Sequence, residues 1–478
     1  MRLREALETK EMSRIAVVAQ AEQLRSVLVA LADAGVVELE RLDDARSDPA
    51  SAALERTHRQ LQTASPSGRD ASPGRTTAES AGLSSPEGAN ALAEQLGEAA
   101  LEQVEDSAVR HNDVAALVGW SPTASTARLS ERLAPLGGAV VVLPAPRGID
   151  PPTLVDAAGA TGAFQPLVDT YATVPYSDLN PSAFAGVAYV VMFGMMFGDV
   201  GHGALLMLAG LLLAFRCPKA LVRVRHLAPF VIGAGLASTA FGFAYGEMFG
   251  PTHIVPTLWM APLDHATTLL AVAVAAGAGL IAIAYGFGTV NRWRERGAAA
   301  ALVATSGGAG VALYAGFGVV GLGWYKHAPG ALLGGAFLAA AGLILSFVGC
   351  YSETSGGAGG AGQAAIELLD VILRIGTNTV SFARLAAFGL THAALGEIVW
   401  SATDGLAHRG PALWFAAGAV FLVGNALTFA LEGLVAGVQA LRLEYYELFS
   451  RIFVTEGRPF RPWHLPPTST KETSCSPG

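Results

Sequence analysis

Charged and polar side chains recur in the last two long apolar segments of the sequence. A charged side chain at the centre of a membrane helix costs about 2.5–3.5 kcal/mol on insertion scales, so each one needs a physical reason. At about 100° of rotation per residue, the polar residues of each segment fall on one helical face. They are Glu367, Asp370, Arg374, Asn378, Ser381, Arg384, Thr391 and His392 in the first segment, and Asn425, Thr428, Glu432, Gln439, Arg442 and Tyr446 in the second. Such stripes are typical of helices that line a hydrated path or face a polar partner.

Arg384 is the charged residue that most needs a partner of opposite charge. It lies in the stretch NTVSFARLAAFGL, where no acid falls within one helical turn. Because arginine keeps its proton in proteins, it needs a carboxylate, and we expect a partner chain to supply it. A fixed cation lowers the pKa of a nearby membrane carboxylate, so a proton-loaded carboxylate that reaches Arg384 would release its proton. An arginine between two half-channels would therefore separate inlet from outlet.

The other polar residues of these stripes have two interpretations. Four of them could hydrate the half-channels and relay protons, since histidine titrates near neutral pH: Glu432, His392, Gln439 and Arg442. His392 could equally be a packing residue. Six further residues could line the half-channels: Asn378, Ser381, Asn425, Thr428, Glu367 and Asp370. For the amides and hydroxyls among these six, the alternative is that they join helices by hydrogen bonds.

Composition indicates a polytopic α-helical membrane protein with a small α/β domain at its N-terminus. The 478 residues are 52% hydrophobic and only 15% charged, whereas soluble domains carry about 25% charged residues. The charges concentrate before residue 180, and residues 183–441 are almost continuously apolar. We therefore expect a cytoplasmic domain over 1–170, a transmembrane domain over 171–450 and a cytoplasmic tail over 451–478.

Eight apolar segments fit the roughly 20 residues that a membrane crossing needs. They cover residues 183–199, 203–216, 228–250, 266–288, 299–325, 330–350, 366–402 and 412–441. The last two are long, and we expect them to be tilted or to protrude. Basic residues follow the second, fourth and eighth segments, which places both termini in the cytoplasm under the positive-inside rule.

The remaining charges and the cysteines exclude several classes of protein. The formal net charge is −8 and no basic stripe occurs in the polar part, so no nucleic acid is expected. The charged start MRLREALETKEMSR is not followed by the apolar region of a signal peptide. Cys217, Cys350 and Cys475 lie far apart and form neither a metal-ligand spacing nor a disulfide framework. We predict no metal and no cofactor.

The N-terminal part contains two β-α-β patterns. The first runs through RIAVVA, a helical stretch closed by Gly35, and VVELERL, and the second covers 114–120, 125–136 and 139–143. Residues 46–112 between them are rich in Ser, Gly, Pro and charge, which predicts a flexible linker. Its flanks, 50–63 and 89–107, could instead pair as a short helical hairpin.

Several motifs resemble the V/A-type ATPase a (or I) subunit family. NTVSFARLAAFGLTHAAL and LEGLVAGVQALRLEYYELFSRIFVTEGRPFRP resemble the signatures of its last two membrane helices. VPYSDLNPSAFAGVAYVVMFGMMFGDVGHG resembles the entry into its first membrane hairpin, and FGFAYGEMFG its third segment. Gly119, Trp120 and Pro122 match a turn in its soluble domain, as does the opening MSRIAVVA. The motifs occur in the family's order.

The resemblance implies a stator subunit of a rotary ATPase. It would provide half-channels for protons or sodium against a rotating proteolipid ring that carries a membrane carboxylate. Further partners would be peripheral-stalk and central-stalk subunits and membrane lipid, and the setting a prokaryotic cell membrane. The sequence has no G-x-x-x-x-G-K-[ST] motif, so we expect ATP chemistry on other subunits and no enzyme activity in this chain alone.

The resemblance also implies roles for single residues. Arg384 matches the family's essential arginine facing the ring, and Arg442 its second arginine. Glu432 and His392 match an acid and a histidine along the half-channels. Two residues of the first hairpin are expected to have a structural role: Asp199 and His202.

One departure from the family and one alternative remain. Family members carry long coiled-coil arms, whereas residues 46–112 lack a heptad pattern, so the peripheral stalk would dock on a shortened arm or on the lobes.

The alternative is a secondary ion transporter or channel with a cytoplasmic regulatory domain. That class predicts internal symmetry and broken helices, and the long, unbroken seventh and eighth segments disfavour it. A membrane-anchored assembly protein without an ion path would not need the polar stripes.

Overall fold

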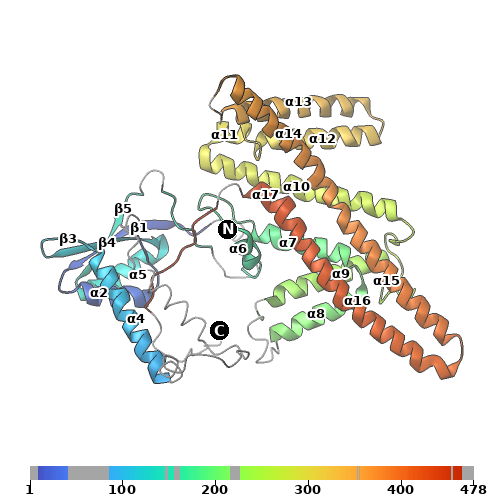
Figure 1. Cartoon of the computed structure of the whole chain (residues 1–478), viewed down its shortest axis with the longest axis horizontal. Coiled ribbons are helices and arrows are strands. Elements are labelled where there is room, and N and C mark those ends of the chain that lie inside the picture. The colour runs from blue at the N-terminus through green and yellow to red at the C-terminus, as the bar shows by residue number, and fades with distance from the viewer. Residues whose placement is uncertain are drawn as a thin grey trace, which may run out of the picture. The chain divides into compact units, whose positions relative to one another are not determined.

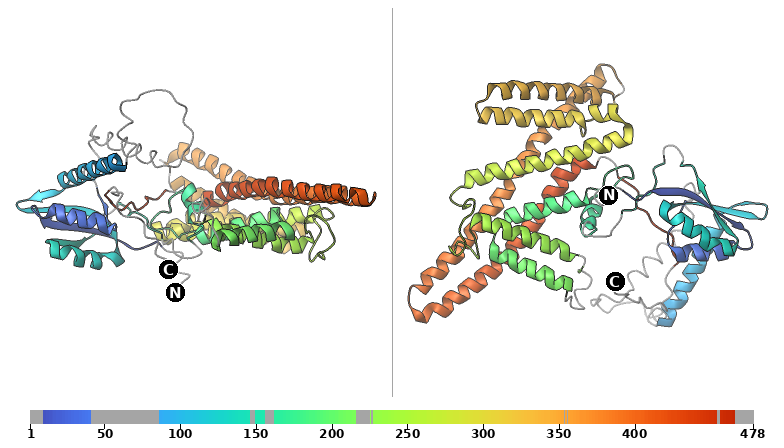
Figure 2. Two further views of the ribbon diagram at one scale, coloured as in Figure 1. Left: turned by 90° about the horizontal axis from the view of Figure 1, so that it is seen from below. Right: turned by 180° about the vertical axis from the view of Figure 1, so that it is seen from behind.

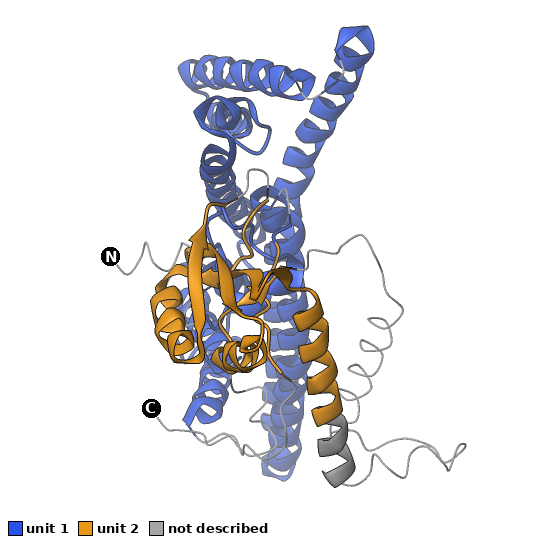
Figure 3. Ribbon diagram, turned by 90° about the vertical axis from the view of Figure 1, so that its left-hand side faces the viewer, with its two compact units in different colours: residues 1–9, 155–457 blue, residues 10–154, 458–478 orange. Residues whose placement is uncertain are grey.

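The computed structural model describes residues 9–40, 86–145, 149–155, 162–215, 225, 227–352, 354, 356–453 and 456–465. The chain forms two compact units, shown in different colours in Figure 3. The sheet unit comprises residues 10–154 and 458–478, and the membrane unit comprises residues 1–9 and 155–457. The end of the chain, expected to be a separate tail, thus contributes residues to the sheet unit.

The sheet unit is built from two β-α-β halves, as the sequence predicted. Its strands are β1 (Met12–Gln20), β2 (Glu38–Leu39), β3 (Val109–His111), β4 (Val114–Pro122) and β5 (Gly138–Leu143). They pair in the order β2-β4-β1-β5, with β3 on β4, and every pair is antiparallel. The helices are α2 (Leu24–Ala34), α4 (Pro86–Asp106), α5 (Thr123–Leu133) and the 3-10 turn η1 (Ala134–Leu136). This is the split β-α-β arrangement.

Periodicity explains the core of the sheet unit. Ile15 and Val17 alternate along β1 towards one face, and Val27 and Leu31 recur at helical spacing on α2. Gly35 ends α2 in the left-handed conformation at φ 58°, which favours glycine. Helix α4 covers most of the predicted second flank, 89–107, whereas the first flank, 50–63, lies outside the described residues.

Gly119 and Trp120 lie in strand β4, which confirms the strand predicted over 114–120, and the turn implied by the family resemblance was wrong. A Cβ atom on Gly119 would come within 2.5 Å of the Glu38 carbonyl oxygen, so glycine lets strand β2 approach. Trp120 is buried, and its Nε1 donates a hydrogen bond to Glu40 Oε1 at 2.6 Å. Arg14 donates to the other oxygen of the same carboxylate at 2.6 Å. The motif therefore fixes a strand and a buried polar network.

The chain leaves and rejoins the sheet unit at neighbouring points. The Thr153 amide donates to the Arg458 carbonyl at 2.7 Å, and the Phe460 amide donates to the Thr153 carbonyl at 3.0 Å. Within the membrane unit, the Gly457 amide likewise donates to the Thr173 carbonyl at 2.9 Å. Because Thr173 precedes the apolar helices and Gly457 follows them, this run of helices begins and ends at neighbouring points.

The membrane unit is helical. Its helices are α6 (Gln165–Tyr171), α7 (Ser182–Met196), α8 (Val200–Phe215), α9 (Ala228–Tyr245), α10 (Ala266–Arg296), α11 (Ala298–Val303), α12 (Gly308–Tyr325), α13 (Pro329–Ser352), α14 (Gly357–Ser381), α15 (Ala383–Ala407), η3 (Pro411–Leu413), α16 (Trp414–Leu443), the π-helical turn η4 (Glu444–Phe449) and α17 (Ser450–Ile452). Six stretches of the described chain are long and apolar enough to cross a membrane. The shorter apolar helices α7 and α8 bring the number of segments to the eight that the sequence predicted.

The seventh apolar segment, expected to be unbroken, is two helices. Helix α14 ends at Ser381 and α15 begins at Ala383, with Phe382 between them. Phe382 is fully buried, and a Cβ atom on Gly277 of α10 would come within 2.0 Å of its ring. The missing side chain at Gly277 therefore leaves room for the ring that anchors the break, and Arg384 lies in the first turn after it.

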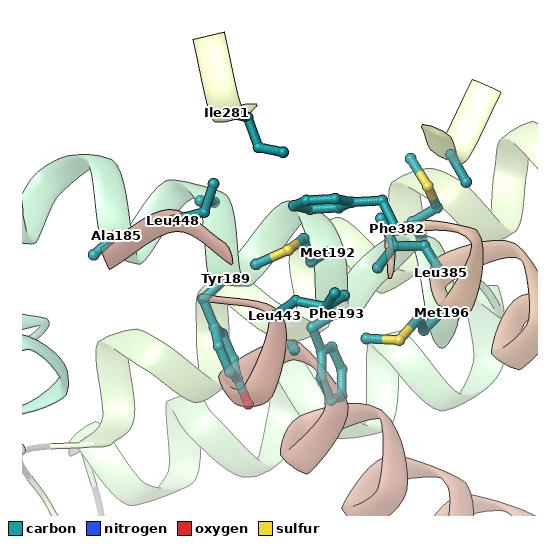
Figure 4. Close-up of a cluster of buried hydrophobic side chains, with 14 of the residues drawn as sticks. Ala185, Tyr189, Met192, Phe193, Met196, Ile281, Phe382, Leu385, Leu443 and Leu448 are labelled. Carbon is teal, nitrogen blue, oxygen red and sulfur yellow. The ribbon is translucent and has the colours of Figure 1, made fainter. Parts of the chain in front are cut away.

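Helix α7 lies at the centre of the apolar core. Figure 4 shows Met192 and Phe193 of α7 among Ile281 of α10, Leu385 of α15 and Leu443 of α16, and all five are buried. The outer helices instead expose large apolar side chains over long stretches, which is typical of a surface covered by lipid.

Helices α15 and α16 lie side by side, as Figures 1 and 2 show. The short connection through η3 makes them antiparallel neighbours. This pairing turns the polar stripes of the two segments towards each other and creates the candidate site.

Candidate functional site

The first polar group is the Arg384 cluster, defined as Ser381, Arg384, Gln439 and Glu447. Arg384 Nη1 donates a hydrogen bond to Gln439 Oε1 at 3.4 Å. Its Nη2 lies 3.6 Å from Glu447 Oε1, and Ser381 also interacts with this carboxylate. The cluster thus joins the break between α14 and α15 to the end of α16.

Glu447 corrects the expectation that no acid of this chain would lie near Arg384. It belongs to the π-helical turn η4, which continues α16 and is remote from Arg384 in sequence. Sequence reasoning missed it because only acids within one helical turn were considered. The signal in the sequence was weak, because Glu447 follows Gln439 by eight residues and falls about 80° away from it around the helix.

The contacts of Arg384 are long and leave one side of the guanidinium open. A charge-assisted hydrogen bond measures about 2.7–2.9 Å, so the 3.6 Å separation from Glu447 is an ion pair without a tight hydrogen bond. The Arg384 side chain is 25% exposed. Beside it opens a cleft of about 510 Å³, lined by apolar residues together with Arg384, Ser381 and Thr267. A permanent cation therefore faces a cleft on an otherwise apolar surface.

The second polar group is the His392 cluster, defined as Asp199, His202, His392 and Glu432. His392 Nδ1 is hydrogen-bonded to the Glu432 carboxylate, and the His392 and His202 ring centres lie 5.6 Å apart. Asp199 accepts the His202 amide at 2.8 Å and the Gly250 amide at 3.1 Å. The first of these bonds is that of a helix N-cap at the start of α8. All four residues are buried or nearly so.

Other predicted site residues lie outside these two clusters. Arg442 is exposed, and no ion pair among the described residues includes it. Glu367 and Asp370 are exposed on α14, where Asp370 pairs with Arg374 one turn further on. The first half of the seventh stripe therefore does not reach Arg384.

The small polar residues of the stripes are mostly turned inward. Asn425 and Thr428 are buried on α16, and Asn425 donates to the Phe421 carbonyl at 2.9 Å. Asn378 and Ser381 are half-buried near the end of α14. These positions suit either helix contacts or the lining of a narrow polar path.

A further buried ionic group, which sequence reasoning missed, lies where α10 ends. Arg292 Nη1 and Glu295 Oε2 are 2.7 Å apart, and Asn291 accepts the Leu179 amide at 3.1 Å. Asp178 is fully buried beside them. Burial and the adjacent Glu295 raise the pKa of Asp178 to about 7, although Arg292 acts in the opposite direction. Asp178 therefore exchanges its proton near neutral pH.

Comparison with known proteins finds one family to which part of the chain is similar. A sequence profile of the V-type ATPase 116 kDa subunit family matches residues 109–299. The A-type ATP synthase subunit I of Halobacterium salinarum is 28% identical over 383 residues, which are 66% of this chain and 51% of that protein. The subunit I of Pyrococcus horikoshii is 24% identical over 364 residues, 73% of this chain and 53% of that protein.

A human protein, the V-type proton ATPase 116 kDa subunit a 3, is 35% identical over 122 residues, which are 23% of this chain and 14% of that protein. Over residues 109–299 the chain is similar to the V-type ATPase 116 kDa subunit family, and its longer matches are to archaeal subunits I. The family resemblance read from the sequence is thus confirmed, and the chain is a multi-pass membrane protein.

The chain spans about half the length of the two archaeal subunits I that it matches. The profile match ends at residue 299, before α14, α15 and α16 begin. The roles of Arg384, His392 and Glu432 therefore rest on their geometry and on the motifs around them.

Proposed function

We propose that this chain is the ion-translocating stator subunit of a rotary V/A-type ATPase. It would provide half-channels for protons or sodium, while ATP hydrolysis or synthesis takes place on other subunits. The observation that carries the proposal is Arg384, a permanent cation that is 25% exposed beside a largely apolar cleft and is held only by long contacts. The partner that fits this cleft is a membrane carboxylate on a proteolipid ring.

The contacts of Arg384 suit transient pairing with a passing carboxylate. The Glu447 carboxylate lies 3.6 Å from Arg384, so this long and partly exposed pair contributes at most about 1 kcal/mol. A protonated ring carboxyl that reaches the cation would lose its proton to the polar groups of the half-channel. The carboxylate that remains could then displace Glu447 and move on. Gln439 and Glu447 would hold the guanidinium between these encounters.

The His392 cluster suits the second half-channel. Arg384 and His392 are eight residues apart on α15, which is about 12 Å along the helix. Glu432 and His392 form a hydrogen-bonded pair of titratable groups, which can pass a proton from one to the other. Asn425, Thr428 and Arg442 would hydrate the path on α16. The two polar clusters lie at different positions along α15, and Arg384 belongs to one of them. This arrangement suits an ion path with separate entry and exit half-channels.

Topology supports the expected placement of the termini. Since the membrane unit begins and ends at neighbouring residues, both ends of the chain would lie on one side of the membrane. The basic loops make this side the cytoplasm under the positive-inside rule. We place the sheet unit there, in a prokaryotic cell membrane, where it would meet peripheral-stalk and central-stalk subunits. The domain boundaries at residues 170 and 450 remain proposals of the same kind.

The proposal is tested by Arg384→Ala in the assembled, membrane-reconstituted complex. We expect assembly to persist and ATP-driven ion pumping to fall to background, because no cation remains to discharge the ring carboxylate. Arg374→Ala is the matched control, since this exposed arginine forms its ion pair with Asp370 of its own helix. Normal pumping by Arg384→Ala would refute the proposal.

The break at Phe382 is the feature that favours the alternative, a secondary ion transporter or channel. Such proteins place their sites where membrane helices are interrupted. That function requires ion flux through this chain reconstituted alone in vesicles. We expect no such flux, because the Arg384 cleft needs a ring to complete it.

A further inference from the structure

We propose that Asp199, His202 and His392 form a binding site for a divalent transition-metal ion, with zinc as the best match. One potential ligand atom from each residue lies within 4.8 Å of the other two, and all three residues are buried. The residues come from the start of α8 and from α15, so no spacing in the sequence indicated a metal site. Their ligand types, two imidazoles and one carboxylate, are a set that zinc uses with a fourth position left open.

His202 is buried with little to satisfy its ring nitrogens. Its side chain is 2% exposed, and neither ring nitrogen makes a hydrogen bond of normal geometry, although the Asn425 backbone interacts with the ring. Asp199 Oδ1 lies 3.7 Å from its Nδ1, which is too far for a normal hydrogen bond. The rings of Phe197, Phe249 and Phe429 surround it at centre-to-centre distances of 5.3–5.7 Å. Burying an imidazole without a partner is costly, and a metal ion would supply that partner.

The other two ligands are already held in position. His392 uses Nδ1 for its hydrogen bond with Glu432, which leaves Nε2 for a metal. A carboxylate behind a metal-binding histidine is the usual way to fix the ring and raise its basicity. Asp199 is fixed by backbone amides of residues 202 and 250, and each of its oxygens retains a lone pair.

The charge around the site also favours a divalent cation. Besides Asp199 and Glu432, the buried Glu247 acts electrostatically on His392. Three carboxylates around two imidazoles leave excess negative charge in a buried region unless protons or a cation offset it. Calcium and magnesium prefer shells of oxygen ligands, whereas imidazole suits zinc and its neighbours. This chemistry selects a zinc-like ion.

Binding is tested on the full chain purified in lipid nanodiscs, so it needs neither a ring nor pumping. Cobalt(II) serves as the spectroscopic probe and zinc as its competitor in a calorimetric titration. We expect one ion per chain. His202→Gln and Asp199→Asn should each weaken binding at least tenfold, and Glu432→Gln about 10- to 100-fold through the His392 ring. The control is His408→Gln, since His408 is exposed at the end of α15 and pairs with Asp404; this change should leave binding intact.

Equal binding by wild type and His202→Gln, or no binding by wild type, would overturn the site. If His202→Gln fails to fold by circular dichroism, the near-isosteric Asp199→Asn decides, because asparagine also caps helices.

The consequence for transport rests on the proposed function. A metal on His392 would occupy half of the proposed relay, so zinc should inhibit pumping by the assembled wild-type complex. The zinc concentration that inhibits pumping should be at least tenfold higher in His202→Gln than in the wild type. Each rate is compared with the zinc-free rate of the same protein. Zinc that binds the isolated chain but leaves pumping unchanged would support the site and refute the relay role of His392. Arg384→Ala tests the proposed function separately.

Discussion

Arg384 and His392 lie on the same helix, but their surroundings differ. Arg384 is 25% exposed and has contacts of 3.4 and 3.6 Å, whereas the His392 side chain is 4% exposed and is hydrogen-bonded to Glu432. A charge that is only partly neutralised within its own chain is suited to a partner that binds transiently. A titratable pair enclosed within the chain is suited to passing a proton between fixed groups. The difference fits the proposed roles, in which the Arg384 cluster contacts the rotor and the His392 cluster relays protons.

The largest effect is expected at the enclosed pair of His392 and Glu432. Glu432→Gln should slow ATP-driven pumping roughly tenfold to a hundredfold without stopping it. The reason is that a hydrogen bond to a charged group contributes about 1.5–3 kcal/mol. The measurement is the initial rate of ion uptake by reconstituted vesicles containing the complex. Unchanged rates would remove Glu432 from the path.

A smaller effect is expected at Glu447, the acid within the open cluster. Its ion pair with Arg384 is long and partly exposed, so losing it should cost at most about 1 kcal/mol, less than about a tenfold change in rate. Glu447→Gln should therefore keep most of the pumping activity. A loss as complete as that of Arg384→Ala would show that Glu447, rather than a ring carboxylate, is the essential partner of the arginine.

The smallest expected effect concerns stability at Asp178, outside both clusters. Its pKa is raised from 3.8 to about 7, so the folded chain holds a proton that the unfolded chain has released. Stability should therefore fall as the pH rises from about 4 to about 7 and then level off. Asp178→Asn cannot titrate, so its thermal unfolding midpoint in detergent should change less between pH of about 5 and about 8. An unaltered pH dependence would contradict the assignment, and the exposed Asp404→Asn serves as control.

The sequence predicted the structural features that depend on local patterns of residues. The apolar segments, the two β-α-β halves and the polar faces of α15 and α16 follow from periodicity and composition. The contacts of His392 with Glu432, and of Arg384 with Gln439, can be understood from these faces. Two neighbouring antiparallel helices turn their polar faces towards each other. Each of these follows from neighbours in sequence or from helices joined by a short turn.

Contacts that depend on distant segments were not predictable in this way. Glu447 reaches Arg384 through a π-helical turn, and the break at Phe382 depends on the space at Gly277 of another helix. The approach of His202 to His392 joins the first hairpin to α15. The family resemblance implied a turn at Gly119 and Trp120, whereas here Gly119 makes room for a neighbouring strand.

The central claim is that the open side of Arg384 faces another chain. Ala387 is exposed and lines the same cleft, so it marks this face without touching the charge. In a background with Cys217, Cys350 and Cys475 replaced by serine, the measurement is disulfide cross-linking of Ala387→Cys to a cysteine beside the ring carboxylate. Leu333→Cys on α13, 75% exposed and distant in the fold, is the control. We predict a cross-link from residue 387 and none from residue 333, and the reverse would contradict the account.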